Sequence, residues 1–384
     1  MKKLLAFLCT LTIGLSCCGT VRLGALPAEG ALPAPPSVSA EAAILVNASD
    51  GTVYFEKNAD HPMGPASTTK LMTALVAAEQ TDPSKTVTVA PEAVGIEGSS
   101  IYLIAEEKLT MRELLYALLL SSANDAAIAI AIEVAGSTEE FVRQMNVRAA
   151  ELGLHSTQFC NPHGLYDEAH YTTARELSVI ASAVLKHPLL REIVSTYKTT
   201  ISHNGKPDKR LLVNHNKLLR TYEGAIGMKT GFTKKTGRTL VSAAEQNGLE
   251  LIAVTLNAPD DWRDHTAMLD HGFACYEVVT LADAGSFFYH LPVSGGEKEQ
   301  ITLTNTEPLT LTLRKDHGEI AYRVETKTRF ELAPVRSAKE LGQVTVFCDG
   351  RSVTCPLVST HGVDAKAPAK KGFFERILTF FTVE

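Results

Sequence analysis

Residues 67–187 carry a helical pattern that is bounded on both sides by short strand-like segments. Ahead of this stretch, Ala43–Asn47 and Thr52–Phe55 are β-type runs separated by a Ser-Asp-Gly turn, which predicts a hairpin. Behind it, Thr239–Ala243 and Leu249–Leu256 are strand-like again. This order of elements indicates an α/β domain, with a core large enough to bury a catalytic site.

Several helix starts are marked by a Ser or Thr followed three residues later by Glu, the pattern of a capping box. Apolar residues at helical spacing mark the helices that lack such a box. The boxes are Thr110…Glu113, Ser137…Glu140 and Thr173…Glu176, and further helices are expected over Ser67–Gln80, about Asn124–Val134 and Asp261–Val279.

After about residue 285 the pattern changes to short alternating runs rich in Thr and Val, which predict a small all-β domain over 286–363. These runs are Gln300–Leu313, Ile320–Glu325 and Val344–Val358. A tight hairpin at Asp349-Gly350 would pair Cys348 with Arg351 and not with Cys355. The domain that precedes it is expected over 42–285.

The N-terminus has the pattern of a secretory signal peptide. Lys2 and Lys3 precede an apolar run, Leu4–Leu15, and small residues follow. A run of about a dozen apolar residues is too short for a spanning helix, which needs about 20. We expect cleavage after Ala28, which would leave 29–41, rich in Ala and Pro, as a flexible leader.

The cysteines leave one alternative open at the N-terminus. Cys17 or Cys18 would be the acceptor in a lipoprotein, although Leu-Ser-Cys-Cys fits that pattern poorly. Four of the seven cysteines lie beyond the signal region, and they are too scattered for a disulfide scaffold, so we expect buried thiols. These are Cys160, Cys275, Cys348 and Cys355.

Charge and motif content exclude other classes of function. The net charge of −6 gives no support for nucleic-acid binding, which favours a basic excess. No CxxC or HExxH pattern indicates a metal site. We therefore expect neither a metal nor a cofactor.

Three short motifs could carry chemistry: Ser67-Thr-Thr-Lys70, Ser122-Ala-Asn124 and Lys229-Thr-Gly231. A lone Ser-x-x-Lys is weak evidence, because chance gives roughly one or two in a chain of this length. The chain also holds a second copy of each pattern, at Ser195-Thr-Tyr-Lys198, Ser202-His-Asn204 and Lys235-Thr-Gly237.

Local context separates Ser67 from Ser195. Ser67 stands where a helix is expected to begin, so Lys70, three residues on, lies on the same face. The positive end of the helix favours developing negative charge. Ser195 and Lys198 lie among β-branched residues before Asn-Gly, a context that we interpret as strand and turn, where side chains three apart point to opposite faces.

Context also separates the two Lys-Thr-Gly sequences. Lys229-Thr-Gly231 begins a strand-like segment, whereas Lys235-Thr-Gly237 lies in a stretch dense in Lys, Thr and Gly that indicates a hairpin turn. We therefore take the first as functional.

Four segments, in this order, resemble the serine D-alanyl-D-alanine carboxypeptidases among the low-molecular-mass penicillin-binding proteins. The likeness covers about residues 40–285, and more loosely the rest. It rests on Ala66–Leu75, on Leu118–Ala127, on Asn161–Leu165 with His170–Arg175, and on Asn214–Leu219 ahead of Gly227–Thr233. The resemblance implies a β-lactamase/transpeptidase-like domain, with an antiparallel sheet flanked by helices, followed by the all-β domain.

The resemblance also implies roles for the motif residues. Ser67 is the nucleophile, Lys70 its base and Ser122 a proton relay. Asn124, Lys229, Thr230, Gly231 and Phe232 bind the substrate, a peptidoglycan stem peptide ending in D-Ala-D-Ala, and Phe232 also supplies an oxyanion N–H. β-Lactams are the implied inhibitors.

Lys70 can act as a base only if its pKa falls from about 10.4 towards neutrality. Burial and a second cation both lower a lysine pKa, and Lys229 is the expected second cation. We interpret His163 as a turn residue, His170, His203 and His215 as structural or solvated, and Asn214 and Asn216 as loop braces.

Other functions remain possible from the same motifs. A class A β-lactamase would carry Ser-Asp-Asn and a deacylating Glu, which this chain lacks at the matching places. A DD-endopeptidase would use the same site with a different groove. A non-catalytic wall-binding protein would have a broken motif set, whereas all three motifs are intact here.

The C-terminal segment 364–384 begins with an Ala/Lys/Pro linker. Phe373, Phe374, Ile377, Leu378 and Phe381 then recur at helical spacing beside Lys370, Lys371 and Arg376. This pattern favours an amphipathic helix that lies on a membrane surface, and packing on the β-domain is the alternative. Together with the signal peptide, it places the protein outside the cytoplasm, at the outer face of the bacterial cytoplasmic membrane.

Overall fold

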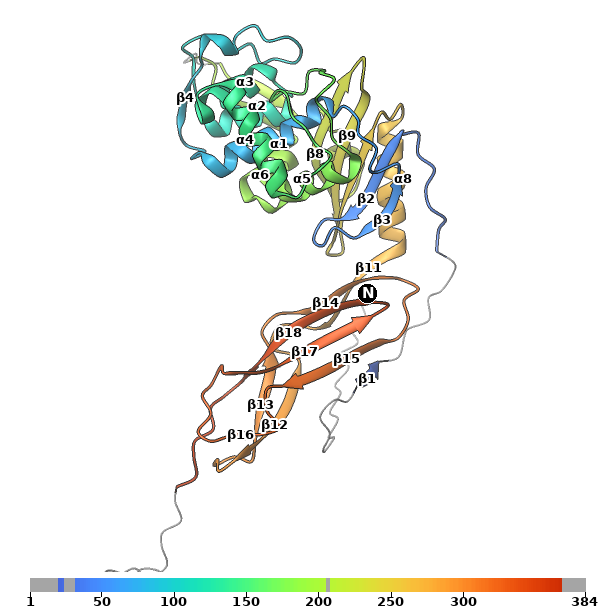
Figure 1. The fold of residues 1–384 in the computed structure, drawn as a ribbon, viewed down its shortest axis with the longest axis vertical. Coiled ribbons are helices and arrows are strands. Elements are labelled where there is room, and N and C mark those ends of the chain that lie inside the picture. The colour runs from blue at the N-terminus through green and yellow to red at the C-terminus, as the bar shows by residue number, and fades with distance from the viewer. Residues whose placement is uncertain (1–19, 24–31, 205–207, 368–384) are drawn as a thin grey trace, which may run out of the picture. The chain divides into compact units, whose positions relative to one another are not determined.

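The computed structural model describes residues 20–23, 32–204 and 208–367 (Figure 1). Contacts divide the chain into one unit over Ala31–Tyr276 and another built from Glu277 onward together with the N-terminal residues. Each unit has its own hydrophobic core.

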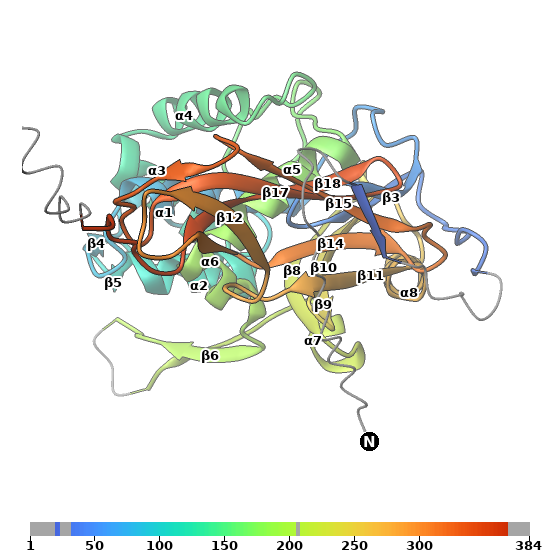
Figure 2. The same ribbon diagram turned by 90° about the horizontal axis from the view of Figure 1, so that it is seen from below.

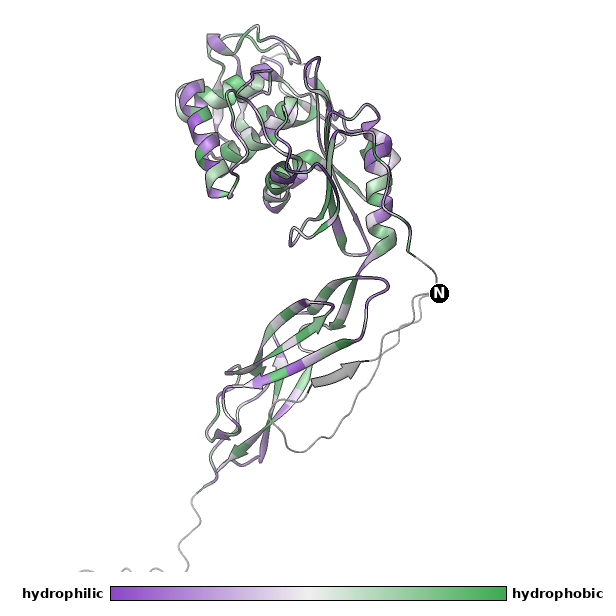
Figure 3. Cartoon of the chain, turned by 45° about the vertical axis from the view of Figure 1, so that its right-hand side comes forward, coloured by the Kyte–Doolittle hydropathy of each residue, from purple (hydrophilic) through white to green (hydrophobic). Residues whose placement is uncertain are grey.

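The first unit is built on an antiparallel sheet in the order β3-β2-β10-β9-β8. Figure 3 shows its strands largely in the colour of hydrophobic residues and the hairpin turns as hydrophilic. The predicted hairpin and the later strands are confirmed. Their bounds are β2 Ala42–Asn47, β3 Val53–Lys57, β8 Ala225–Thr233, β9 Gly237–Gln246 and β10 Leu249–Leu256.

Helices cover both faces of this sheet (Figure 1). Every residue of β2 is buried for that reason: Ile44 packs in the helical core, and Leu45 faces Gly272 of α8. The helices are α1 Lys70–Gln80, α2 Met111–Leu120, α3 Asn124–Ala135, α4 Thr138–Glu151, α5 Ala174–Lys186, α6 Pro188–Ser195, α7 Leu218–Thr221 and α8 Asp261–Cys275, with 3₁₀ turns η1 Ala66–Thr69 and η2 Pro91–Ala93.

Two small hairpin-like pairs complete the unit. Strand β4, Thr86–Thr88, pairs with β5, Lys108–Thr110, just before α2. Strand β6, Lys198–Ile201, pairs with β7, Arg210–Val213, and Figure 2 shows this hairpin projecting below α2 and α6.

Two sequence-based expectations about helices are wrong. Ser195 ends helix α6 and does not lie in a strand, because Pro188 starts a short helix whose Leu190, Ile193 and Val194 are buried. Helix α8 stops at Cys275, and β11, Tyr276–Ala282, replaces the expected continuation to Val279. Tyr and β-branched residues, which favour strands, dominate that segment.

The second unit is all-β, as predicted. Its main sheet has the order β1-β15-β17-β18-β13-β12-β16, and β11 pairs with β14. The runs expected over Gln300–Leu313 and Val344–Val358 each form two strands. The bounds are β1 Thr20–Leu23, β12 Phe288–Ser294, β13 Gln300–Asn305, β14 Leu309–Arg314, β15 Ile320–Thr326, β16 Glu331–Leu332, β17 Glu340–Cys348 and β18 Arg351–Ser359.

The β17–β18 turn confirms the predicted register, since Cys348 lies opposite Arg351. The four cysteines beyond the signal region are all free thiols, and Cys160 alone among them is only partly buried.

Strand β1 occupies an edge of the sheet against β15, and cleavage after Ala28 would remove it. Within the described ranges, no helix combines the length and the apolar character that crossing a bilayer requires.

Candidate active site

Ser67 lies in the 3₁₀ turn η1, directly before α1, so the expected helix start is a tighter turn that leads into the helix. Ala66, the residue before it, has φ of +49°, a left-handed conformation that a non-glycine residue adopts only when its surroundings impose it. Thr68 and Thr69 donate their hydroxyl hydrogens to the carbonyls of Pro65 and Ala66. The turn that presents Ser67 is therefore fixed by its own side chains.

Lys70 is fully buried at the first position of α1. Its Nζ lies 3.1 Å from Ser67 Oγ, and it donates to Asn124 Oδ1 at 2.7 Å and to the carbonyl of His163. Burial, and then the positive charge of Lys229, holds the pKa of Lys70 well below its ordinary value, against the opposing charge of Asp125. A lysine in this state can accept a proton from Ser67.

Hydrogen bonds fix both the side chain and the backbone of Asn124. Its Nδ2 donates to Glu97 O at 2.6 Å, and its backbone N–H donates to Ser99 O at 2.7 Å. The side chain, at the start of α3, therefore has one orientation, with Oδ1 turned to Lys70.

Ser122 lies between α2 and α3 and is only 4% exposed. Its φ of +58° is again left-handed. The N-cap of α3 is Ala123, so Ser122 does not serve as a helix cap. A strained serine next to Asn124 with no capping role fits a functional residue better than a structural one.

Strand β8 runs beside Ser67. A Cβ on Gly231 would lie 2.9 Å from Ser67 N and 2.3 Å from Thr239 Oγ1, so only glycine permits this approach. Thr239, on the neighbouring strand, donates to Pro65 O at 3.1 Å and ties the sheet to the turn that carries Ser67. Phe232, the residue after Gly231 on β8, is 63% exposed.

Lys229 precedes these residues on β8 and is also buried, at 1% exposure. Its Nζ donates to Thr230 O at 2.8 Å. Burial lowers its pKa to about 7. A buried ammonium without a carboxylate partner among these contacts is a favourable place for an anionic group of a ligand.

The loop over residues 161–165 supplies the His163 carbonyl to which Lys70 donates. Asn161 Oδ1 accepts from the N–H of Gly164 at 2.7 Å, which closes a tight turn around His163. Gly164 has φ of +85°, and a Cβ there would lie 1.9 Å from Ala66 O. The loop therefore packs directly against the backbone that precedes Ser67.

The two histidines near this loop are uncharged. Burial, with the charge of Lys70, lowers the pKa of His163 to about 3, and burial lowers that of His170 to about 4. His170 Nε2 lies 2.9 Å from Thr69 Oγ1, so this ring braces the turn, as expected for a structural residue. Asn214 donates to the carbonyls of Val194 and Thr196 at the end of α6, and Asn216 Oδ1 accepts from Leu218 N at the start of α7, which also agrees with their predicted bracing role.

Asp125 is an important residue that the sequence-based analysis missed. It is fully buried and accepts hydrogen bonds from Ser100 Oγ at 2.6 Å, Leu103 N at 3.0 Å and Ala126 N at 2.9 Å. An acidic residue directly after Asn124, in a helix that is apolar from Ala126 to Ile132, was the signal in the sequence for it.

The second copies of the motifs lie elsewhere. Ser195 closes α6 and Lys198 opens β6, so they belong to different elements. Lys235 and Thr236 lie in the turn between β8 and β9, as predicted, and Gly237 begins β9. Ser67, Lys70, Asn124 and Gly231, by contrast, converge on one site.

Comparison with known proteins agrees with this geometry. The family model described as D-alanyl-D-alanine carboxypeptidase, peptidase family S11, matches residues 30–260. This chain belongs to that family. It is 32% identical over 385 aligned residues to the D-alanyl-D-alanine carboxypeptidase DacF of Bacillus subtilis, with 97% of this chain and 96% of the relative covered.

Solved structures give the same answer for the fold. Penicillin binding protein 5 from Haemophilus influenzae superimposes with a TM-score of 0.68 at 27% identity, over 86% of this chain and 99% of that one. The Streptomyces K15 DD-transpeptidase matches with a TM-score of 0.60 at 34% identity, over 63% of this chain and 100% of that one. The predicted family, fold class and enzyme class are confirmed.

Proposed function

We propose that this enzyme removes the terminal D-alanine from peptidoglycan stem peptides through an acyl-enzyme on Ser67. The observation that carries the proposal is the position of Lys70, which is fully buried, has a lowered pKa and lies 3.1 Å from Ser67 Oγ. A serine hydroxyl becomes an effective nucleophile only when a neighbouring base takes its proton.

In the proposed reaction, neutral Lys70 accepts the hydroxyl proton as Ser67 Oγ attacks the carbonyl carbon of the penultimate D-alanine. The backbone N–H groups of Ser67 and Phe232 stabilise the oxyanion. The peptide C–N bond breaks, and the proton passes through Ser122 to the amine of the departing D-alanine. Water then hydrolyses the ester and regenerates Ser67.

Substrate binding is assigned to the polar groups that surround this pair. Lys229 and Thr230 bind the free carboxylate of the terminal D-alanine, which supplies the anion that the buried ammonium lacks. Gly231 lets the substrate backbone approach, and Asn124 holds its amide. A β-lactam acylates the same serine and inhibits the enzyme.

The test is the Ser67→Ala variant, assayed for D-alanine release from a synthetic peptide ending in D-Ala-D-Ala and for covalent labelling by fluorescent penicillin. Both signals should disappear, while Ser195→Ala, in the second Ser-x-x-Lys, should keep both. Labelling that survives in Ser67→Ala would overturn the assignment. A wild type that neither takes the penicillin label nor releases D-alanine would favour the non-catalytic alternative.

A crosslinked muropeptide in the same assay distinguishes the endopeptidase alternative. Mass spectrometry of the products should show loss of a single D-alanine from pentapeptides. Cleavage of dimers to monomers as the main reaction would instead favour an endopeptidase on the same residues.

We also propose export and attachment to the outer face of the membrane through the C-terminal amphipathic segment. The charged and apolar pattern of the N-terminus and the apolar spacing near the C-terminus support this. Both segments lie outside the described residues. Deletion of 372–384 should release the protein from isolated membranes, and unchanged membrane association would overturn the anchor.

A further inference from the structure

The loop over residues 97–107 holds Asn124, and a buried carboxylate ties it to the rest of the protein near each end. At the active-site end, Glu97 O and Ser99 O bind Asn124, and Asp125 receives the N–H of Leu103. At the far end, the side chain of Glu107 is wholly buried. The loop between these ties contains no regular helix or strand.

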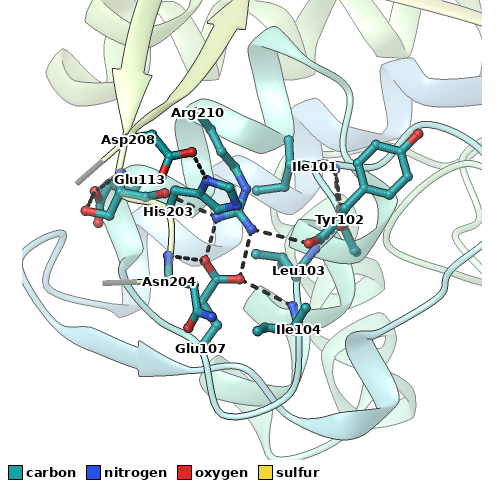
Figure 4. Close-up of polar contacts among 12 residues, drawn as sticks. Ile101, Tyr102, Leu103, Ile104, Glu107, Glu113, His203, Asn204, Asp208 and Arg210 are labelled. Carbon is teal, nitrogen blue, oxygen red and sulfur yellow. Dashed lines mark hydrogen bonds and ion pairs between the residues drawn. The ribbon is translucent and has the colours of Figure 1, made fainter. Parts of the chain in front are cut away.

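Glu107 receives hydrogen bonds from two directions (Figure 4). Within the loop, the N–H of Ile104 donates to it at 3.3 Å. From the β6–β7 hairpin, Asn204 N donates at 2.9 Å, and both terminal nitrogens of Arg210 bind its two oxygens. Arg210 NH2 also donates to the carbonyl of Tyr102 at 3.3 Å.

Arg210 comes from a part of the chain about a hundred positions away, yet its side chain is only 11% exposed in this ion pair. The same hairpin is fastened once more by Glu113, which accepts from Ser202 N at 2.9 Å and from Ser202 Oγ at 2.6 Å. Glu113 belongs to α2, whose last residue, Leu120, is two residues before Ser122. The hairpin is thus bonded both to the loop that contacts Asn124 and to α2, the helix that leads into the Ser-Ala-Asn motif.

The loop is also strained, which shows that its ties determine its shape. Tyr102 and Glu106 have φ of +58° and +63°. Non-glycine residues keep such angles only when surrounding contacts hold them, and they relax when those contacts are removed. A relaxed loop would move the Glu97 carbonyl that orients the Asn124 amide.

We propose that Glu107 and Arg210 are positioning residues for the reaction: their ion pair sets the loop that holds Asn124, and through Asn124 it sets Lys70. This inference rests on the proposed function. The side-chain hydrogen bonds of Glu107 and Arg210 go to the loop and to the hairpin, and the pair acts through the amide of Asn124, whose Oδ1 is 2.7 Å from Lys70 Nζ.

A double-mutant cycle tests the proposal. Arg210→Met removes the ion pair, and Asn124→Ala removes the group that it positions. Arg210→Met should lower kcat/KM for D-alanine release about tenfold in the wild-type background and less than about twofold in the Asn124→Ala background, because interacting residues are not additive. A purely structural role would give the same factor in both backgrounds, and that result would overturn the proposal.

Two further variants keep the test decisive. Arg210→Lys retains the charge but not the two-point contact, and it should recover part of the lost activity. Arg143→Met, at an exposed ion pair with Glu140 on α4, is the matched control and should change kcat/KM by less than about twofold. Should Arg210→Met not fold, as judged by its thermal transition, the near-isosteric Glu107→Gln replaces it in the same cycle.

The outcomes separate the inference from the function on which it rests. A wild-type enzyme that releases no D-alanine removes the proposed function. An active wild type with additive effects of Arg210→Met and Asn124→Ala removes only the positioning role.

Discussion

At the scale of single residues, the site is built on two buried lysines, Lys70 and Lys229. An isolated buried charge destabilises a fold, so burying these two lysines costs stability, which supports the roles proposed for them. The two positive groups also disfavour each other, which helps to keep Lys70 neutral.

The charge of Lys229 gives the first prediction. Its folded pKa of about 7 lies below the ordinary value of 10.5, so between these values the unfolded chain binds more protons and stability rises with pH. Below pH 7 the penalty for the buried ammonium is complete. Lys229→Met should therefore stabilise the protein at pH 6 by roughly 2–4 kcal/mol while it abolishes D-alanine release.

Urea unfolding at pH 6 and at pH 9.5 measures the effect, which should shrink at the higher pH. Lys234→Met, on the exposed turn after β8, is the control and should leave stability within about 0.5 kcal/mol at both values. A Lys229→Met variant that is less stable than the wild type at pH 6 would contradict the argument.

Gly164 gives a second prediction. The effect of its contact with the turn that carries Ser67 can be measured by comparison with Gly153, a glycine of similar backbone conformation. Gly164 and Gly153 both have left-handed backbones, with φ of +85° and +76°. A Cβ at Gly164 would meet Ala66 O at 1.9 Å, whereas one at Gly153 would meet no atom within 4 Å. Gly153→Ala should cost only about 1 kcal/mol of backbone strain.

Gly164→Ala should cost more, about 2–4 kcal/mol, and should slow acylation of Ser67 by penicillin at least tenfold, because the loop must move away from Ala66. Thermal unfolding and stopped-flow labelling measure the two effects. Equal acylation rates in the two variants would show that the contact does not position the nucleophile.

The proximity of Ser67 and Lys70 could be predicted, because a Ser-x-x-Lys at a helix start carries its geometry in its spacing. Asp125, Glu107 and the carbonyl of His163 could not. Their importance comes from contacts such as Glu107 with Arg210, between segments about a hundred residues apart. A buried acid looks the same in a sequence as a solvated one.

At the scale of elements, the capping boxes differ from their sequence pattern. Only Thr110…Glu113 forms the reciprocal box. Ser137 and Thr173 cap their helices, but the glutamates that follow them bind elsewhere: Glu140 pairs with Arg143, and Glu176 binds the 155–157 turn.

This difference gives a third prediction. Glu176 accepts from the N–H groups of His155 and Ser156 and from Thr157 Oγ1, whereas Glu140 faces solvent with an exposed arginine. Glu176→Ala should lower the free energy of unfolding by about 2 kcal/mol, since three donors lose their partner, and Glu140→Ala by less than about 0.5 kcal/mol. Chemical denaturation compares the pair, and equal losses would contradict the assignment of Glu176 as a tertiary contact.

Strands and long helices were predictable from periodicity, and their ends were not. The α8 to β11 transition at Tyr276 carries no Gly or Pro, so the apolar pattern continued smoothly across it. Helix α6 is only eight residues long. Its β-branched residues favoured a strand in the sequence-based interpretation, although Pro188 is typical of a helix start.

At the scale of the whole molecule, the two units do not share a core. The buried residues of one cluster all lie between Ala42 and Leu256, and those of the other between Leu291 and Val363. Each unit thus buries its own apolar surface, which is the physical requirement for a domain that folds alone. All predicted site residues belong to the first unit.

The last prediction follows from this division. A fragment over residues 31–276 should unfold cooperatively and keep kcat/KM for D-alanine release within about threefold of the full chain, because it contains the partners with which Ser67, Lys70 and Asn124 form hydrogen bonds among the described residues. The Streptomyces K15 structure supports this, since 63% of the present chain covers all of it. The stack of Tyr54 on Tyr276, with ring centroids 3.7 Å apart, makes Tyr276 the natural end of the fragment.

Penicillin labelling and calorimetry of the fragment, compared with the same fragment carrying Ser67→Ala, measure both properties. A folded fragment that neither labels nor releases D-alanine, beside an active full chain, would mean that the β unit takes part in catalysis.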